Sequence, residues 1–266
     1  MPTVGGQSKR GPGDRAADGH YHRHDPVETG AEREVFGMRF GVLGTGIVGR
    51  SIAGGLAGLD HDVVIGTRDT AAVMARTDRD AMGNEPFAVW KESNASVKLG
   101  TFADAAAHGE MVVNATNGAG ALDALEAAGE GNLDGKTVID IANPLDFSHG
   151  MPPSLLVCNT DSLGERIQRA FPGAKVVKTL NTVTAAVMTG PTLVGHGDHT
   201  IFVSGNDAEA KSQVIDLLRS FGWHDVVDLG DITSARAVEM YLPLWVGLMG
   251  SLGTPMFNVK VARAQG

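Results

Sequence analysis

The chain has 266 residues, of which 42% are hydrophobic and 20% are charged, as in ordinary globular proteins. The net charge of −9 argues against a nucleic-acid-binding surface, which is normally basic. The single cysteine, Cys158, excludes an intramolecular disulfide, and no uninterrupted apolar run reaches the roughly 18–20 residues of a membrane helix. We therefore expect a cytoplasmic protein without a membrane or nucleic-acid partner.

Residues 1–37 differ in composition from the rest of the chain. They are rich in Gly, Pro, His, Asp, Glu and Arg and contain almost no aliphatic residues. Such a segment cannot bury enough apolar surface to offset the entropy lost on ordering. We predict a disordered N-terminal tail, with Met38 as an alternative natural start.

From Met38 onward, apolar strands alternate with helical segments. We predict strands at 39–43, 62–66, 97–99, 110–114, 136–141, 174–179, 200–204 and 225–229. Between them we predict helices at 46–59, 70–93 with breaks near Gly83 and Pro86, 119–128, 162–170 and 208–221, a loop at 143–161, and an apolar helical region at 232–252 containing Pro243. This alternation indicates an α/β fold with a mainly parallel sheet that is buried on both faces.

A Gly-x-Gly-x-x-Gly motif follows the first strand and opens the first helix, the context that is typical of dinucleotide binding. Gly44 permits the tight turn, Gly46 lets the backbone approach a pyrophosphate, and Gly49 lets the helix pack on the sheet. The free N–H groups and the dipole at the helix start favour an anion. The residues of this motif predicted to bind the cofactor are Gly44, Thr45, Gly46, Ile47, Val48 and Gly49.

The end of the second strand indicates which dinucleotide is bound. NAD-binding proteins place Asp or Glu about twenty residues after the glycines to bond the ribose 2′-OH, whereas this chain has Thr67 and Arg68 there. A hydroxyl and a guanidinium can bind a 2′-phosphate, and Asp69 is expected to point away. We predict NADP(H) as the cofactor; the alternative for Arg68 is a solvated loop cation.

Polar residues follow three later strands, beyond whose carboxyl ends ligands bind in open α/β sheets. A nicotinamide and a second substrate could meet there, although a turn or helix-cap role is the alternative for each residue. The segment 180–183 follows the third of these strands. The predicted cofactor-binding residues after the first two are Ala115, Thr116, Asn117, Ala142, Asn143 and Pro144.

With these motifs, the sequence resembles the NADPH-dependent coenzyme F420 reductase family (F420-dependent NADP oxidoreductases) from about Met38 to Ala262. The resemblance is carried by residues 44–49, 65–68, 180–183 and 229–239. It implies a Rossmann-type doubly wound domain with a small C-terminal α/β and helical extension, a homodimer, and hydride transfer between the nicotinamide and a deazaflavin, coenzyme F420. It also implies that Thr67 and Arg68 hold the 2′-phosphate and that Asn181 and Val183, the candidate catalytic residues, lie beside the stacked rings.

We expect an NADP-binding Rossmann domain at residues 38–179 and a smaller substrate or dimerisation part at 180–266. The sequence differs from the archaeal deazaflavin enzymes of this family at Asn181, where those enzymes have His. Asn181, with Asn143 and Pro144, is more similar to the cytosolic reductase domain of the six-transmembrane metalloreductases, which pass hydride from NADPH to flavin. FMN or FAD is therefore the alternative second substrate.

Hydride transfer between two bound rings needs little acid–base help from the protein. Accordingly, we find no Ser-His-Asp or Cys-His arrangement and no metal-ligand spacing among the histidines, and we expect no metal. Reduction of a small C=O or C=N substrate would need a proton donor, and no Lys or His is evident in the cleft. A non-catalytic NADP sensor is a further alternative. Arg236 and Glu239, spaced i, i+3, could pair with each other, line the cleft or support a dimer interface.

Overall fold

The structure is a computed structural model that describes residues 37–80 and 83–264, so the predicted tail lies outside the described residues except for Gly37. The strands are β1 (Arg39–Leu43), β2 (Asp62–Thr67), β3 (Lys98–Thr101), β4 (Met111–Asn114), β5 (Thr137–Asp140), β6 (Leu145–Asp146), β7 (Ser154–Leu155), β8 (Lys175–Thr179), β9 (Thr200–Gly205) and β10 (Asp225–Asp228). Valine and isoleucine dominate the central strands because branched side chains pack well on a pleated surface.

The helices follow the strands in regular alternation, and several begin at a residue whose side chain accepts a backbone N–H, as Asp69, Ser162 and Asp207 do. Such caps stabilise a helix start by about 1 kcal/mol. The α-helices are α1 (Ile47–Gly58), α2 (Thr70–Ala75), α3 (Phe87–Ser93), α4 (Phe102–His108), α5 (Ala121–Ala128), α6 (Glu130–Leu133), α7 (Leu163–Ala170), α8 (Ala185–Thr189), α9 (Ala208–Ser220), α10 (Ala235–Met240) and α11 (Leu242–Leu252). Short 3₁₀ turns are η1 (Gly118–Gly120), η2 (Pro191–Leu193), η3 (Gly195–Gly197) and η4 (Ile232–Ser234).

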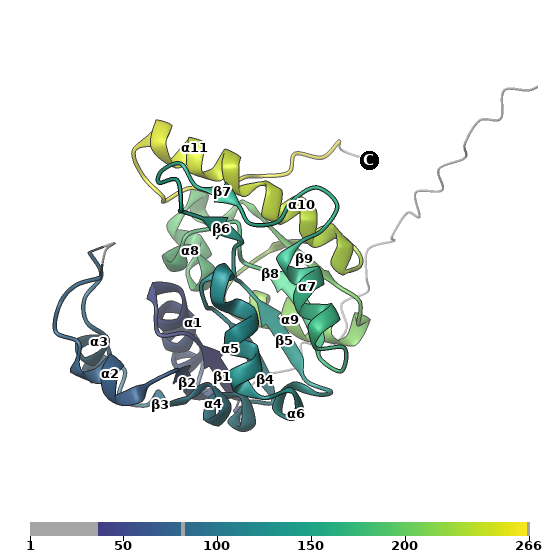
Figure 1. Ribbon diagram of the computed structural model, residues 1–266. Coiled ribbons are helices and arrows are strands. Elements are labelled where there is room, and N and C mark those ends of the chain that lie inside the picture. Colours follow the sequence, from purple (N-terminus) through teal and green to yellow (C-terminus); the bar gives the residue numbers. More distant parts are fainter. Residues whose placement is uncertain (1–36, 81–82, 265–266) are drawn as a thin grey trace, which may run out of the picture. The chain divides into compact units, whose positions relative to one another are not determined.

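Eight of the strands form one sheet in the order β10-β9-β8-β5-β4-β1-β2-β3 (Figure 1). The six strands from β3 to β8 are parallel neighbours in the order of a Rossmann fold. The predicted Rossmann-type, mainly parallel sheet is therefore confirmed. Strand β9 is antiparallel to β8, and β10 is parallel to β9. Strands on both sides of residue 180 thus share one sheet, and the predicted division at that residue stays a prediction.

Alternate strand residues point to opposite faces, so the core has two layers. Phe40 and Val42 of β1 pack with α1, α8 and α9 on one face. Leu43 packs with α4, α5 and α7 on the other face, and Figure 1 shows helices flanking the sheet. Burying one such side chain stabilises the fold by about 1.5–3 kcal/mol. The layers hold the carboxyl ends of the strands in place, and the polar loops that follow those ends form the candidate site.

The predicted elements agree with the structure over most of the sheet, and the differences have physical causes. Helix α4 was not expected, nor was the short β6–β7 hairpin inside the predicted loop at 143–161. The predicted helical region at 232–252 is divided at Tyr241, and Pro243 lies in the first turn of α11, where its missing N–H has no intrahelical acceptor. Within the described part of the chain, no helix has the length and apolar character needed to span a membrane.

Candidate functional site

The turn between β1 and α1 depends on its glycines. Gly44 has a φ of +113°, in the region that favours glycine. Its N–H donates to the carbonyl of Gly66 in β2 over 2.9 Å. A Cβ on Gly49 would lie 1.8 Å from the carbonyl oxygen of Gly44, whereas a Cβ on Gly46 would meet no protein atom within 4 Å. Gly44 and Gly49 therefore close the turn, and Gly46 leaves open space in front of it.

The start of α1 has free hydrogen-bond donors. Gly46 caps the helix without a side chain, and the first turn contains no acidic residue. Arg50 is the first residue whose N–H has an acceptor within the helix, the carbonyl of Gly46. The preceding amides of Ile47, Val48 and Gly49 have no acceptor among the described residues. Free amides, the helix dipole and the space at Gly46 fit a diphosphate, so a dinucleotide is compatible with the residues present.

Thr67 and Arg68 lie at the end of β2, beside the glycine turn. Thr67 is half-buried and Arg68 is exposed. Within residues 37–80 and 83–264, the guanidinium of Arg68 takes part in no hydrogen bond or ion pair. Asp69 caps helix α2, because its carboxylate accepts the N–H of Ala72 over 2.9 Å. The side chains of Thr67 and Arg68 are thus available to an anion.

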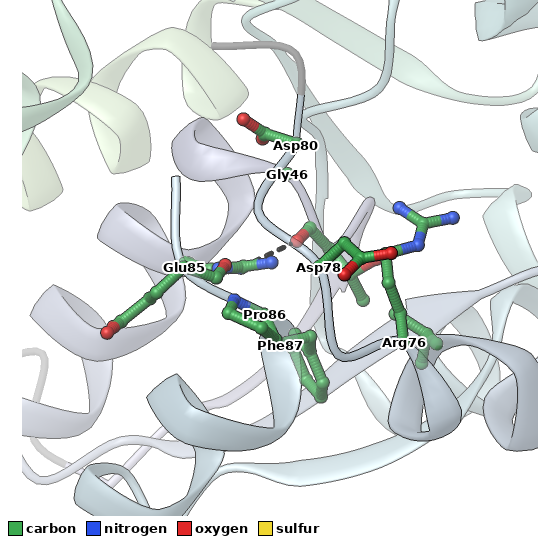
Figure 2. A pocket seen from close by; sticks show the side chains of 10 residues that line it. Gly46, Arg76, Asp78, Asp80, Glu85, Pro86 and Phe87 are labelled. Atoms are coloured by element: carbon green, nitrogen blue, oxygen red, sulfur yellow. Dashed lines mark hydrogen bonds between the residues drawn. The ribbon is translucent and has the colours of Figure 1, made fainter. Parts of the chain in front are cut away.

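A small pocket of about 90 Å³ lies between the glycine turn and the segment that joins α2 to α3. Figure 2 shows Gly46 on one side of it and Arg76, Asp78 and Phe87 on the other. Arg50 forms part of the wall; its guanidinium donates to the carbonyl of Thr45 over 2.8 Å and to that of Glu85 over 2.5 Å. Burial lowers the pKa of Arg50. Arg50, which was absent from the predicted site, therefore holds the segment after α2 against the glycine turn.

The predicted residues after β4 form a short polar loop. The N–H of Ala115 donates to the carbonyl of Leu43, which places the loop against the glycine turn. The hydroxyl of Thr116 donates to Oδ1 of Asn114 over 2.6 Å. Asn117 is exposed, and its side chain accepts the N–H of Ala119 and caps η1. The structure thus brings these residues beside the glycine turn. Asn117 caps a helical turn, which was the alternative to a cofactor-binding role for this residue.

Asn143 and Asn181 form a pair of side-chain amides that joins the loops after β5 and β8. Nδ2 of Asn143 donates to the carbonyl of Asn181 over 2.9 Å, and Nδ2 of Asn181 donates to Oδ1 of Asn143 over 3.1 Å. Nδ2 of Asn181 also donates to the carbonyl of Val238 in α10. Ala142 and Pro144, on either side of Asn143, are buried. The structure therefore brings together the predicted residues of two strand ends and connects them to the C-terminal helices.

The two candidate catalytic residues lie in a constrained turn. Asn181 is 3% exposed and Val183 is 5% exposed. Leu180, just before them, has a φ of +58°, which is rare for a residue other than glycine. The hydroxyl of Thr182 is buried and has no hydrogen-bond partner among the described residues. A strained turn with an unsatisfied buried hydroxyl is typical of functional sites. The catalytic roles of Asn181 and Val183 stay predictions.

A buried lysine that the sequence analysis missed lies beneath these loops. Lys178 of β8 is fully buried, and its ammonium donates to Asp140 over 2.9 Å and contacts Glu239 at 3.0 Å. It also donates to the carbonyl of Ala142. Burial lowers the pKa of Lys178, but the neighbouring Asp140 and Glu239 raise it more, and the net shift is upward. All three protons of Lys178 have acceptors, so it is not the free proton donor that a C=O or C=N reductase would need.

Arg236 and Glu239 of α10 do not pair with each other, which had been one of three possibilities. Arg236 binds Glu165 of α7 through two hydrogen bonds, which lower the pKa of Glu165. Glu239 is buried and accepts the backbone N–H groups of Leu163 and Gly164 at the start of α7, over 2.8 and 3.0 Å. Both residues therefore hold α10 against α7.

Comparison with known proteins agrees with this geometry. The sequence model of the family described as "NADP oxidoreductase coenzyme F420-dependent" matches residues 39–144. The chain is 31% identical over 218 residues to the F420-dependent NADP reductase of Methanocaldococcus jannaschii, a match that covers 79% of this chain and 92% of that protein. A crystal structure from Arthrobacter sp. FB24, provisionally described as an F420-dependent NADP reductase, is 58% identical with a TM-score of 0.82 and covers 85% of this chain and 100% of its own.

The metalloreductase STEAP3 of Rattus norvegicus is 27% identical over 212 residues, or 78% of this chain, but the chain spans only 38% of that protein. The family resemblance expected from the motifs is confirmed by the M. jannaschii relative, because the similarity extends over most of both chains. NADP(H) binding follows from the family and agrees with the glycine turn, the free helix start and the free Arg68. The chain belongs to the coenzyme F420-dependent NADP oxidoreductase family and is an NADP-dependent oxidoreductase.

Proposed function

We propose that the protein transfers hydride between NADP(H) and a deazaflavin of the coenzyme F420 type. The observation that carries this proposal is the 31% identity with an F420-dependent NADP reductase over 92% of that enzyme's length. The bound nicotinamide would supply or accept the hydride. The chain's own contribution is to bind and orient the two ring systems, which matches the paired, mostly buried amides of Asn143 and Asn181.

We assign the binding roles by position. The free amides of α1 would hold the diphosphate, and Thr67 with Arg68 would hold the 2′-phosphate. The loops after β4, β5 and β8 would receive the nicotinamide, with Thr116 and the Asn143–Asn181 amide pair at its edge. Asn181 and Val183 would lie beside the stacked rings, which makes their strained turn the proposed site of hydride transfer.

Absorbance measurements test this proposal directly. The protein is mixed with NADPH and either coenzyme F420 or FMN, and the oxidation of NADPH is followed. We expect turnover with coenzyme F420. Turnover with FMN alone would replace the proposal by flavin reduction, which is favoured by the similarity to the metalloreductase STEAP3. Tight NADPH binding without turnover on either acceptor would contradict both, and would favour a small C=O or C=N substrate or an NADP sensor.

We also propose that the enzyme is a homodimer through its C-terminal helices. Helix α11 is strongly apolar, yet Leu242 is its only buried residue, while Leu244 is 58% exposed and Leu252 is 55% exposed. Exposed apolar surface of this kind usually marks an interface. Light scattering should give twice the mass of one chain. A monomer, or a dimer that Leu244→Glu leaves intact, would contradict this interface.

A further inference from the structure

The buried group formed by Asp140, Lys178 and Glu239 connects strand β5, strand β8 and helix α10. The three side chains are 0–1% exposed, and the ammonium of Lys178 has an acceptor for each of its protons. Asp140 also accepts the side-chain amide of Asn114 over 2.9 Å and the N–H of Ala142 over 3.2 Å. One continuous set of hydrogen bonds and ion pairs therefore joins three strands to α10.

Stability alone does not explain such a group. Burying an ion costs several kcal/mol, and well-packed apolar residues of similar volume are often as stable or more stable. The arrangement also buries two carboxylates with one ammonium, which leaves one negative charge in excess. Backbone N–H groups at the start of α7 offset part of that charge at Glu239. The group is better explained by the loops that it holds in position.

Two of its connections end at the proposed nicotinamide loops. The peptide groups of Ala142 are held on both sides, because its N–H donates to Asp140 and its carbonyl accepts from Lys178. Ala142 directly precedes Asn143, whose amide pairs with Asn181. On the other side, Asp140 orients Asn114, and Oδ1 of Asn114 accepts the hydroxyl of Thr116.

A third connection runs through α10. Glu239 holds α10 to Lys178 and to α7, and the carbonyl of the preceding residue, Val238, accepts Nδ2 of Asn181. The amide of Asn181 is thus oriented by a helix whose position depends on Glu239. The side chains of Asp140, Lys178 and Glu239 themselves contact neither the glycine turn nor Arg68 among the described residues.

We propose that Lys178, Asp140 and Glu239 together position the nicotinamide end of the site. We propose that they do so without affecting how the adenosine end of the cofactor binds. The proposal rests on the proposed hydride transfer for its rate prediction, but its binding prediction needs only an NADP site. Misplacing reacting groups by about 1 Å can lower a rate by about a hundredfold. The group therefore controls the orientation of the ring without touching it.

The test compares two matched variants at the contact between α7 and α10. Glu239→Gln removes the charge that faces Lys178, whereas the control, Glu165→Gln, makes the same change in a neighbouring buried carboxylate that binds Arg236 instead. Lys178→Met is a poorer choice, because two buried carboxylates would lose their cation and the chain could fail to fold. Asn114→Ala is a second variant that cuts the connection to Thr116 without any change in charge.

Affinity is measured by calorimetry for NADPH and for 2′,5′-ADP, which has the adenosine end and lacks the nicotinamide. We expect Glu239→Gln and Asn114→Ala to weaken NADPH by about tenfold and to leave 2′,5′-ADP unchanged, while Glu165→Gln changes neither. The single-turnover rate of hydride transfer should fall by about ten- to a hundredfold in Glu239→Gln and in Asn114→Ala, and should not change in Glu165→Gln. A purely structural role would weaken both ligands equally.

The outcomes separate the two proposals. If the unmodified protein reduces neither coenzyme F420 nor FMN, the proposed function fails, but the ratio of the two affinities still tests the positioning role. Three results would overturn the positioning role. The first is an equal loss of affinity for NADPH and 2′,5′-ADP, and the second is equal behaviour of Glu239→Gln and Glu165→Gln. The third is unchanged affinity and rate in both Glu239→Gln and Asn114→Ala.

Discussion

Replacing Arg68 by Ala tests how the enzyme selects NADP(H). A charge-assisted contact to a phosphate is worth about 1.5–3 kcal/mol. Arg68 is exposed, so solvent screens the contact and the lower end of that range applies, which corresponds to about a tenfold loss of NADPH affinity. Because Arg68 has no hydrogen bond or ion pair in the described part of the chain, its removal should change the free energy of unfolding by less than about 0.5 kcal/mol.

The assay is a pair of titrations, with NADPH and NADH, at two salt concentrations. We expect Arg68→Ala to weaken NADPH about tenfold and to leave NADH almost unchanged, with a larger effect at low salt. Arg219→Ala is the matched control, because Arg219 is an exposed arginine on α9 that pairs with Asp216. Equal losses for NADPH and NADH would refute the assignment of Arg68 to the 2′-phosphate.

Two further predictions concern the glycine turn and a buried histidine. Gly49→Ala should abolish NADPH binding, because the new Cβ would overlap the carbonyl of Gly44. It should also lower the free energy of unfolding by about 3 kcal/mol or more, measured by thermal unfolding. The control, Gly58→Ala at the other end of α1, has free space for a Cβ and should be neutral or stabilising. Burial lowers the pKa of His61 in the folded chain below its value in the unfolded chain. As the pH falls below about 6.5, the unfolded chain is therefore protonated at His61 before the folded chain is, and the free energy of unfolding should decrease. His61→Phe, packed against Phe40, should make unfolding less sensitive to pH between about 6.5 and 5; an unchanged pH profile would contradict this explanation.

The first half of the sheet could be predicted because its signals are local. Strand β1, the glycine motif and strand β2 follow one another within thirty residues, and each constrains the interpretation of the next. Helix α4, which was not predicted, also has a local signal in the sequence. Thr101 and Asp104 form a capping box, in which each side chain accepts a backbone N–H of the other residue. The sequence spacing of that motif was visible without the structure.

Other features depend on contacts between distant residues, and local patterns cannot predict them. The direction of β9 is one example, because a strand has the same composition whether it pairs parallel or antiparallel. Lys178 is another. A lysine that follows two valines on a buried strand suggests an ionic partner, but its partners Asp140 and Glu239 lie on other elements, 38 and 61 positions away in the sequence. Only the assembled sheet brings these charges together.

The strained turn at Leu180 is tolerated because its neighbours stabilise it by more than the strain costs. A left-handed conformation costs a residue other than glycine about 1–2 kcal/mol, and φ at Leu180 is +58°. The buried side chain of Leu180, at 3% exposure, offsets about 1.5–3 kcal/mol. The two hydrogen bonds from the amide of Asn181 add about 1 kcal/mol each. Glycine would remove the strain, but it would also remove the buried side chain and leave a more flexible backbone before Asn181, so we expect Leu180→Gly to hold the Asn181 amide less firmly against α10.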